Sequence, residues 1–280
     1  MPFLLGIDGG GTGCRAVLAD AAGRILGQGR SGPANIVTDL EGARGSILAA
    51  AGQAGAEAGV EVSAVHAVLG LAGANLPDYA RRLAALLPFA RSRIVSDAVI
   101  ALKGALGEAD GVVATIGTGS VFAGQSSGRV SQIGGWGFQL GDEASGAWLG
   151  RALLARALHA ADGLVETSPL LAALSGEMGG PEAIVDFARS ASPADFGRHA
   201  PRLFDTDDAA ATAILAQADA WIARCIDRLA AGPAAQVTFL GGLGPLFAAR
   251  LAPRYGARLR PARGSALDGA LLLARQEGQP

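Results

Sequence analysis

The sequence predicts an α/β protein built from two similar units, and three observations support this prediction. Strand and helix patterns alternate along the 280 residues. A strand, glycine turn, strand, turn, strand pattern occurs twice, over residues 3–29 and again over 111–133. Half of the residues are hydrophobic, which is enough for each unit to bury a core. We interpret the repeat as an internal duplication; the alternative is a chance similarity of two glycine-rich hairpins.

The first unit is expected to begin with an antiparallel meander followed by alternating helices and strands. Thr38 or Asp39 can cap the first helix, because either side chain can accept a hydrogen bond from a helix N–H group. Pro77 is suited to the first turn of the next helix. The expected strands are 3–7, 14–20, 25–29, 64–69 and 93–95, and the expected helices are 39–58, 77–87 and 98–106.

The second unit is expected to repeat the meander and then to become mostly helical. We place the boundary near residues 104–110, which gives domains at 1–106 and 107–263. The expected strands are 111–116, 121–125, 130–133, 237–240 and a short one near 258–260. The expected helices are 145–160, 170–178, 181–188, 205–231 and a last one that ends at residue 274.

Composition excludes several classes of protein. With 23 basic and 25 acidic residues the net charge is −2, so no basic nucleic-acid surface is expected. Two cysteines cannot build a disulfide framework or a four-thiolate metal site. No apolar run is long enough to cross a membrane, and the first residues lack the basic region of a signal peptide. We therefore expect a cytoplasmic protein.

The first candidate site is the glycine cluster that follows the first strand. Gly10 and Gly11 expose backbone N–H groups without side chains in the way, which suits a phosphate group, and Thr12 adds a hydroxyl. Asp8 is placed to hold Mg²⁺ beside such phosphates, through water. The alternative is a plain hairpin turn with a capping aspartate.

Two other phosphate-binding motifs fit poorly. A Walker A loop requires a lysine, and the only lysine is Lys103, in an unrelated segment. The letters of a dinucleotide-binding loop occur at residues 11–16, but a strand follows them where a helix is required.

The second repeat carries a matching turn, Gly117, Thr118, Gly119 and Ser120. Two such turns that face each other across a cleft could hold one nucleotide from both sides, so the pair is more specific than either turn alone. Arg15 could add positive charge there, or it could simply be a solvated residue on a strand.

Three further segments could carry chemistry. Asp97 lies between a strand and a helix, where it can be a helix cap or a general base. In the loop 134–150, Trp136 and Trp148 can be core residues, and Asp142 can cap a helix or accept hydrogen bonds from sugar hydroxyls. Gly241 and Gly242 can let an adenine ring approach the backbone, or they can form an ordinary turn between a strand and a helix.

The order of these motifs resembles the sugar kinase, actin and hexokinase superfamily, and within it the BadF-type ATPases and the glucosamine and N-acetylglucosamine kinases. The segment from Gly135 to Gly146 is the most specific part of the resemblance. It implies two ribonuclease-H-like (actin-like ATPase) domains with a cleft between them. It also implies that a closing helix over residues 264–280 packs back on the first domain.

The resemblance implies the following roles. ATP with Mg²⁺ would lie on both glycine turns, with adenine near Gly241 and Gly242. Asp97 would take the proton of the sugar 6-hydroxyl as it attacks the γ-phosphate. The sugar would contact Asn35, Gly73, Asp97, Gly135, Trp136 and Asp142. A homodimer is compatible with the resemblance, although no interface signature is visible.

Three features depart from the family pattern. Gly13 stands where relatives often have Lys or Arg, Ala144 replaces a usual glycine, and the chain is short for the family. The branch with an iron–sulfur cluster is excluded because Cys14 and Cys225 lack its spacing, and the zinc-containing branch is excluded because it needs a Cys/His cluster.

The sequence therefore predicts a kinase that phosphorylates the 6-hydroxyl of glucosamine or N-acetylglucosamine. The alternatives are a nucleotide-dependent switch without a small-molecule substrate and, less well supported, a dinucleotide-dependent enzyme. The sequence leaves open whether position 2 of the sugar carries an amine or an acetamide.

Overall fold

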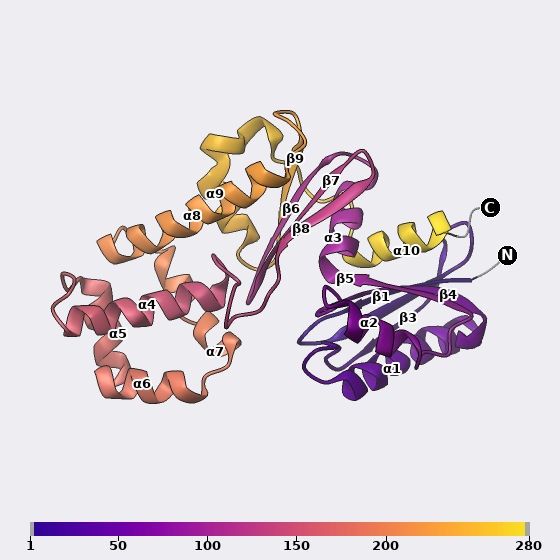
Figure 1. Cartoon of the computed structure of the whole chain (residues 1–280), viewed down its shortest axis with the longest axis horizontal. Coiled ribbons are helices and arrows are strands. Elements are labelled where there is room, and N and C mark those ends of the chain that lie inside the picture. Colours follow the sequence, from indigo (N-terminus) through magenta and orange to yellow (C-terminus); the bar gives the residue numbers. More distant parts are fainter. Residues whose placement is uncertain (1–2, 278–280) are drawn as a thin grey trace. The chain divides into compact units, whose positions relative to one another are not determined.

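The computed structural model describes residues 3–277 and divides the chain into two compact units. Unit 1 comprises residues 1–111, 125–130 and 261–280, and unit 2 comprises residues 112–124 and 131–260. Each unit contains one β-sheet with helices packed on it (Figure 1).

The sheet of unit 1 has five strands in the order β3-β2-β1-β4-β5. β1, β2 and β3 form the expected antiparallel meander, whereas β4 and β5 continue the sheet parallel to β1. The strands are β1 (Phe3–Gly9), β2 (Cys14–Ala19), β3 (Ile25–Ser31), β4 (Val65–Leu71) and β5 (Arg91–Ser96).

Helices cover both faces of this sheet (Figure 1). One face, with Leu5 and Ile7, packs on α1 (Leu40–Ala58), which Asp39 caps as predicted, by accepting a hydrogen bond from the N–H of Gly42. α2 (Pro77–Ala84) contributes Leu83 to the same core. The other face, with Leu4 and Val68, packs on α3 (Asp97–Leu106) and α10 (Ala266–Glu277).

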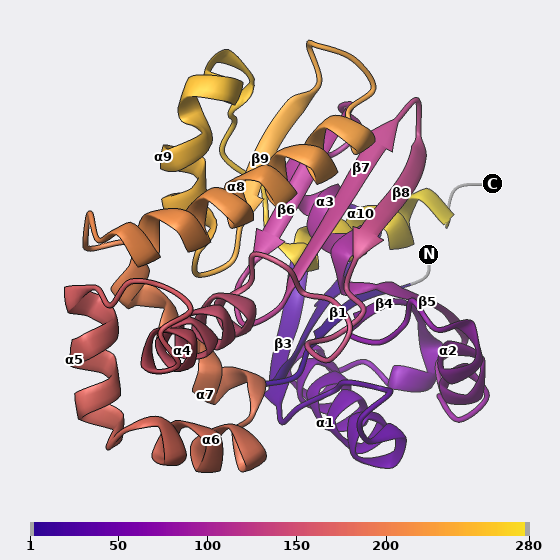
Figure 2. The same ribbon diagram turned by 60° about the vertical axis from the view of Figure 1, so that its left-hand side comes forward.

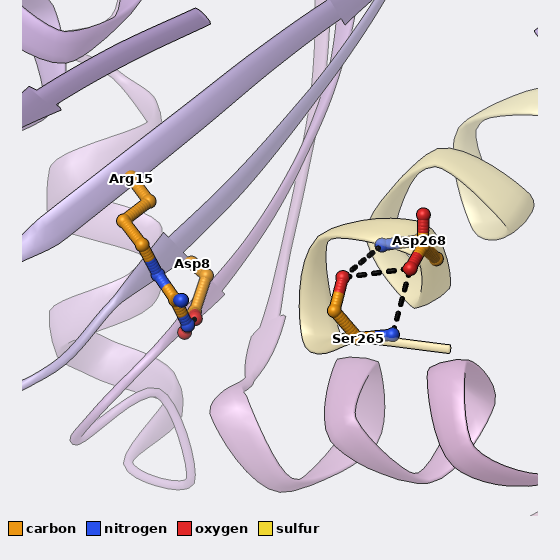
Figure 3. A network of polar contacts seen from close by, with 4 residues as sticks. All are labelled: Asp8, Arg15, Ser265 and Asp268. Carbon is orange, nitrogen blue, oxygen red and sulfur yellow. Dashed lines mark hydrogen bonds and ion pairs between the residues drawn. The ribbon is translucent and has the colours of Figure 1, made fainter. Parts of the chain in front are cut away.

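The last helix is held tightly in unit 1. A Cβ atom on Gly269 would lie 2.0 Å from the carbonyl oxygen of Ile100, so only glycine allows α10 to come this close to α3. Ser265 and Asp268 form a reciprocal cap at the start of α10: the Ser265 N–H donates to the Asp268 carboxylate at 2.7 Å, and the Asp268 N–H donates to Ser265 Oγ at 3.2 Å (Figure 3).

The sheet of unit 2 repeats the order of the first, as β8-β7-β6-β9. A single parallel bridge joins Val237 to Leu259 at the position that corresponds to β5. The short strand expected near residues 258–260 is therefore reduced to one bridge, because the helix η3 (Gly256–Arg258) takes up its first residues. The strands are β6 (Gly111–Ile116), β7 (Ser120–Ser126), β8 (Arg129–Gly134) and β9 (Gln236–Leu240).

The remainder of unit 2 is helical, as expected, and Figure 2 shows α4 to α7 grouped beside α8. The predicted helix over 205–231 begins later, because Asp208 is its N-cap. The Tyr255 hydroxyl donates its hydrogen bond to Asp227 Oδ1 at 2.9 Å, with Ala223 O at 3.2 Å as a weaker second acceptor, and so ties the last helix of the unit to α8. The helices are α4 (Gly146–Ala161), α5 (Pro169–Met178), α6 (Pro181–Ser190), α7 (Pro193–Gly197), α8 (Ala209–Leu229) and α9 (Gly244–Tyr255).

Candidate functional site

The predicted site residues of unit 1 follow the carboxyl ends of three adjacent parallel strands. Gly9 of β1 pairs with Leu71 of β4, and Leu71 pairs with Ser96 of β5. Asp8, the loop after Leu71 and Asp97 therefore share one edge of the sheet. Because neighbouring strands lie about 4.8 Å apart, β1, which carries Asp8, and β5, which ends just before Asp97, are roughly 10 Å apart. This edge is where α/β proteins usually bind ligands.

The glycine turn after β1 leaves donor groups without partners. Gly10 N donates to Gly13 O at 2.9 Å, and Gly10 O accepts from Ala34 N at 2.8 Å. Among residues 3–277, the exposed N–H groups of Gly11 and Thr12 have no acceptor. A Cβ atom on Gly10 or Gly11 would meet nothing within 4 Å, so packing does not explain the glycines. The turn can accommodate an anion that approaches the backbone closely.

Asp8 forms an ion pair with Arg15 (Figure 3). The two residues are opposite each other in the β1–β2 hairpin, so their side chains share one face of the sheet. The Asp8 side chain is 17 % exposed and that of Arg15 is 53 % exposed. From the sequence, Arg15 could either add positive charge at the site or be a solvated residue on a strand. The ion pair places its guanidinium group beside the carboxylate of Asp8. The hairpin register would have identified this pairing.

Asp97 is the first residue of α3, and its carboxylate accepts a hydrogen bond from Ala98 N at 2.8 Å. Ser96 takes the N-cap position without a side-chain capping bond, so the interpretation of Asp97 as the cap is wrong. Burial raises the pKa of Asp97; the Ala98 hydrogen bond opposes this shift and the negative charge of Asp8 adds to it. A partly buried carboxylate with a raised pKa is suited to accept a proton.

Asn35 and Gly73 lie on neighbouring loops of unit 1, which are joined by the hydrogen bond from Ile36 N to Ala72 O at 3.1 Å. Asn35 Oδ1 accepts from Val37 N at 3.0 Å, so the amide orientation is fixed. Its Nδ2 group has no acceptor among the described residues and is available to a ligand. Gly73 has a φ of 89°, which explains the glycine by backbone conformation alone.

In unit 2, the turn between β6 and β7 is supported by the start of α4. Gly146 N donates to Gly117 O at 2.8 Å, and Ala147 N donates to Thr118 O at 3.2 Å. Within residues 3–277 the N–H groups of Thr118 and Gly119 have no acceptor, which makes this turn comparable to the one in unit 1. Ser120 differs, because its hydroxyl donates to Glu143 O at 2.7 Å and is buried.

Asp142 is held against this turn. A Cβ atom on Gly119 would lie 2.9 Å from Asp142 Oδ2, so the carboxylate lies directly on the glycine. Burial raises the pKa of Asp142, hydrogen bonds from the N–H groups of Ser120 and Gly137 oppose this shift, and the charge of Glu143 adds to it. Asp142 does not cap α4, because Ser145 does so by accepting from Trp148 N at 3.1 Å. The carboxylate keeps room for one or two further donors.

The loop that carries Trp136 has an unusual backbone. Left-handed φ angles occur at Gly134, Gly135, Gly137, Asp142 and Ala144, with values of 80°, 73°, 85°, 58° and 66°. The value at Ala144 lies in a region that glycine adopts without strain, which agrees with the glycine that the resemblance leads us to expect there. Trp136 is 65 % exposed, so the interpretation of it as a core residue is wrong, whereas Trp148 packs partly buried against the core of unit 2.

Gly241 and Gly242 serve different purposes after β9. Gly241 has a φ of 83°, and a Cβ atom there would lie 2.3 Å from Ile116 O, so the fold itself requires this glycine. Gly242 has open space around it. Only Gly242 therefore remains without a structural reason to be glycine.

A metal ion at this site would need ligands beyond the protein. Among the described residues, no group of three or more His, Cys, Asp or Glu side chains could hold one. The carboxylate of Asp8 is a hard oxygen ligand that suits Mg²⁺, and this ion commonly takes its other ligands from water and phosphate oxygens. The residues present therefore fit Mg²⁺ bound together with a nucleotide.

The duplicated sheets and their paired glycine turns define the class of actin-like ATPases, with two ribonuclease-H-like domains. The model of the BadF/BadG/BcrA/BcrD ATPase family matches residues 5–244, so the chain belongs to this family. This confirms the resemblance drawn from the motifs.

None of the helices in residues 3–277 is long and apolar enough to cross a membrane.

Three known proteins are similar to this chain in sequence or in fold. Glucosamine kinase GspK of Vibrio cholerae is 31 % identical, with 98 % of this chain and 96 % of that protein covered. A solved structure from Chromobacterium violaceum, provisionally described as an N-acetylglucosamine kinase, is 34 % identical with a TM-score of 0.84, and 98 % of this chain and 99 % of that one are covered. A ROK family glucokinase from Streptomyces griseus, 19 % identical with a TM-score of 0.59 over 98 % of both chains, shares the fold.

Proposed function

We propose that the protein is an ATP-dependent amino-sugar kinase that transfers the γ-phosphate of ATP to the 6-hydroxyl of glucosamine or N-acetylglucosamine. The observation that carries this proposal is Asp97, a carboxylate of raised pKa at the edge of the unit 1 sheet where the parallel strands end. The loop of Asn35, whose Nδ2 group has no partner among the described residues, is joined to the end of β4 at the same edge by the hydrogen bond from Ile36 N to Ala72 O. A switch that only binds nucleotide needs no base of this kind. The similarity to a glucosamine kinase over 98 % of the chain supports the substrate class.

The proposed mechanism assigns each residue a limited task. Asp97 accepts the proton of the 6-hydroxyl while the oxygen forms its bond to the γ-phosphorus and the bond from phosphorus to the β-phosphate oxygen breaks. The Asn35 amide group donates a hydrogen bond to the sugar and orients it. In unit 2 the carboxylate of Asp142, Trp136 and the loop at Gly135 provide further sugar contacts. Gly73 contributes to the sugar site through its left-handed backbone, which brings its loop against Asn35.

The nucleotide is proposed to bind through backbone groups. The N–H groups of Gly11 and Thr12 in unit 1 donate to phosphate oxygens, and Gly10 leaves room for the anion because it has no side chain. The N–H groups of Thr118 and Gly119 do the same in unit 2, where Gly117 and Ser120 shape the turn. The backbone at Gly241 and Gly242 lies beside the adenine, and Asp8 holds Mg²⁺ through water. When bound, this ion neutralises charge that develops on the phosphates.

The first test is ATP consumption by the purified protein with Mg²⁺ and each of four sugars: glucosamine, N-acetylglucosamine, glucose and N-acetylmannosamine, with a sample without sugar. We expect strong stimulation by one amino sugar and a product that carries phosphate at position 6. This result would also decide between the amine and the acetamide. Slow hydrolysis that no sugar changes would refute the kinase and favour the nucleotide-dependent switch.

The second test is Asp97→Asn, which keeps the size of the side chain but removes the base. We expect sugar phosphorylation to fall by about 10²–10⁴-fold or more while ATP binding is unchanged. Asp162→Asn, at an exposed position after α4, is the control and should keep full activity. Normal turnover in Asp97→Asn would remove Asp97 from the role of base.

A further inference from the structure

A cavity of about 640 Å³ lies in the helical part of unit 2, and none of the residues assigned a role above lines it. Its wall is formed by Arg156 of α4 and by residues 166–170 and 206–210, at the starts of α5 and α8. Cavities of this size suit a small molecule such as a phosphorylated monosaccharide.

Arg156 of α4 lines this cavity and has no partner. Among residues 3–277, no acceptor receives a hydrogen bond or ion pair from its guanidinium group, and its Nε atom is buried. Leaving a buried donor such as Nε unpaired costs free energy, which points to an acceptor that the described fold does not itself provide. Arginine is especially suited to phosphate and carboxylate groups, which it binds through two parallel hydrogen bonds.

At the cavity, the first N–H groups of α5 and α8 are bonded to a carboxylate of the protein, so that carboxylate is not the acceptor of Arg156 and those N–H groups do not bind an anion in its place. Asp208 accepts from Leu170 N of α5 at 3.0 Å and from Ala210 N of α8 at 2.8 Å, so one carboxylate caps both helices. These hydrogen bonds hold the pKa of Asp208 below its ordinary value, against the effect of burial. The anion-binding capacity of the cavity therefore depends on Arg156.

The exposed rim of the cavity has the opposite charge. Glu166 and Asp207 line it, both are exposed, and neither has a partner among the described residues. The hydroxyl of Thr167, also exposed, lies on the same rim. A ligand that satisfies Arg156 inside and the two carboxylates outside must carry a negative and a positive group.

We propose that this cavity is a second binding site for a small zwitterion, with its phosphate or carboxylate at Arg156 and its ammonium group at Glu166 and Asp207. The choice of probe rests on the proposed function, because the 6-phosphate of glucosamine carries both groups. A site for this product, separate from the site of phosphoryl transfer, would let the concentration of phosphorylated amino sugar change the activity of the enzyme.

Calorimetric titration of the full chain tests the site. The probes are glucosamine 6-phosphate, glucose 6-phosphate, glucosamine and inorganic phosphate, and the variants are Arg156→Met and Arg156→Lys. Arg189→Met, an exposed arginine of α6 outside the cavity, is the control. We expect glucosamine 6-phosphate to bind wild type and Arg189→Met at one site more than Arg156→Met, and Arg156→Lys to retain weakened binding.

Each outcome of the titration is decisive. Glucose 6-phosphate and inorganic phosphate should bind the Arg156 site at least tenfold more weakly, because they lack the ammonium group. Superimposable isotherms for wild type and Arg156→Met would overturn the site, and equal binding of glucose 6-phosphate would overturn the zwitterion. Binding needs no turnover, so an Arg156-dependent site in a protein without kinase activity would separate this inference from the proposed function.

The melting temperature without ligand provides a second measurement. Because Arg156 has no partner in the fold, Arg156→Met should melt at the same temperature as wild type or higher. A clearly lower melting temperature would mean that Arg156 supports the fold, and would contradict its assignment to a ligand.

Discussion

Asp8 and Asp97 lie two strands apart at one edge of the same sheet, and the negative charge of Asp8 helps to raise the pKa of Asp97. The charge of Asp8 thus disfavours the ionised form of Asp97, in addition to the larger effect of burial. Arg15 offsets the charge of Asp8 but is half exposed, so it does so only in part. Any change that neutralises Asp8 should make Asp97 easier to ionise.

We therefore predict that Asp8→Asn lowers the pKa of Asp97. The substitution removes a negative charge and keeps the shape of the side chain, so the part of the shift that burial causes should remain. The measurement is an NMR titration of the Asp97 carboxyl carbon in the protein without ligands. Asp78→Asn, which changes an exposed aspartate of α2, is the control and should leave the titration unchanged. An identical pKa in wild type and Asp8→Asn would show that the two groups are not coupled.

From the raised pKa of Asp97 we also predict how the stability of the fold depends on pH. Its pKa is raised in the folded protein, so the folded state binds the proton more tightly than the unfolded state does, and its ionisation destabilises the fold. The free energy of unfolding should fall as pH rises from the ordinary range of aspartate through the raised pKa, by about 1.4 kcal/mol for each unit of pKa difference. Asp97→Asn, which resembles the protonated state, should be the more stable protein at neutral pH.

Urea unfolding of wild type and Asp97→Asn between pH 3.5 and 8 measures this difference. We expect the curves of stability against pH to converge at the acidic end and to separate above it. A constant difference across the range, or a less stable variant at neutral pH, would contradict a raised pKa for Asp97.

Much of the fold could be predicted because local signals agree with the tertiary structure. Alternating strand patterns around glycine turns identified both meanders, and the cap at Asp39 was visible in the sequence. The strand near residues 258–260 was overpredicted, because a single bridge and a 3₁₀ turn satisfy that segment. The short helix α7 was missed, although Ser192 and Asp195 carry the spacing of a reciprocal cap.

The candidate site could be predicted only as a set of residue types. The sequence could not show that Asp142 lies on Gly119, because that contact depends on five left-handed residues between them and on the helix start at Ser145. Likewise, no pattern reveals that Arg156 lacks a partner, since this depends on how α4, α5 and α8 pack. Pairings across long stretches of chain are set by tertiary packing.

Gly241→Ala and Gly242→Ala should separate a structural glycine from a functional one. Gly241 has a left-handed φ, and its Cβ would clash with Ile116 O, so we expect a loss of about 2 kcal/mol or more of unfolding free energy. Gly242 has open space, so its alanine variant should keep its stability to within about 0.5 kcal/mol.

Thermal unfolding and ATP titration of both variants measure the difference. If the backbone at Gly242 lies beside adenine, Gly242→Ala should bind ATP more weakly even though it is stable. Unchanged ATP affinity in this variant would place the adenine elsewhere, and a stable Gly241→Ala would contradict the close approach to β6.

Trp136 and Trp148 offer a matched pair within one segment. Trp136 is 65 % exposed, so Trp136→Ala should change the unfolding free energy by at most about 0.5 kcal/mol. Trp148 packs against the core of unit 2, so Trp148→Ala should cost about 2 kcal/mol, less than a fully buried tryptophan. If Trp136 contacts the sugar, its loss should raise KM for the amino sugar and leave KM for ATP unchanged.

Steady-state kinetics at a temperature where both variants are folded decides the role of Trp136. We expect the opposite pattern in Trp148→Ala: lower stability with nearly normal KM values. Exposing a large aromatic ring to water is unfavourable, and this ring stands between Gly135 and Gly137, whose left-handed φ angles set the course of the loop. An unchanged sugar KM in Trp136→Ala would remove the residue from the sugar site and leave its exposure to be explained by another partner.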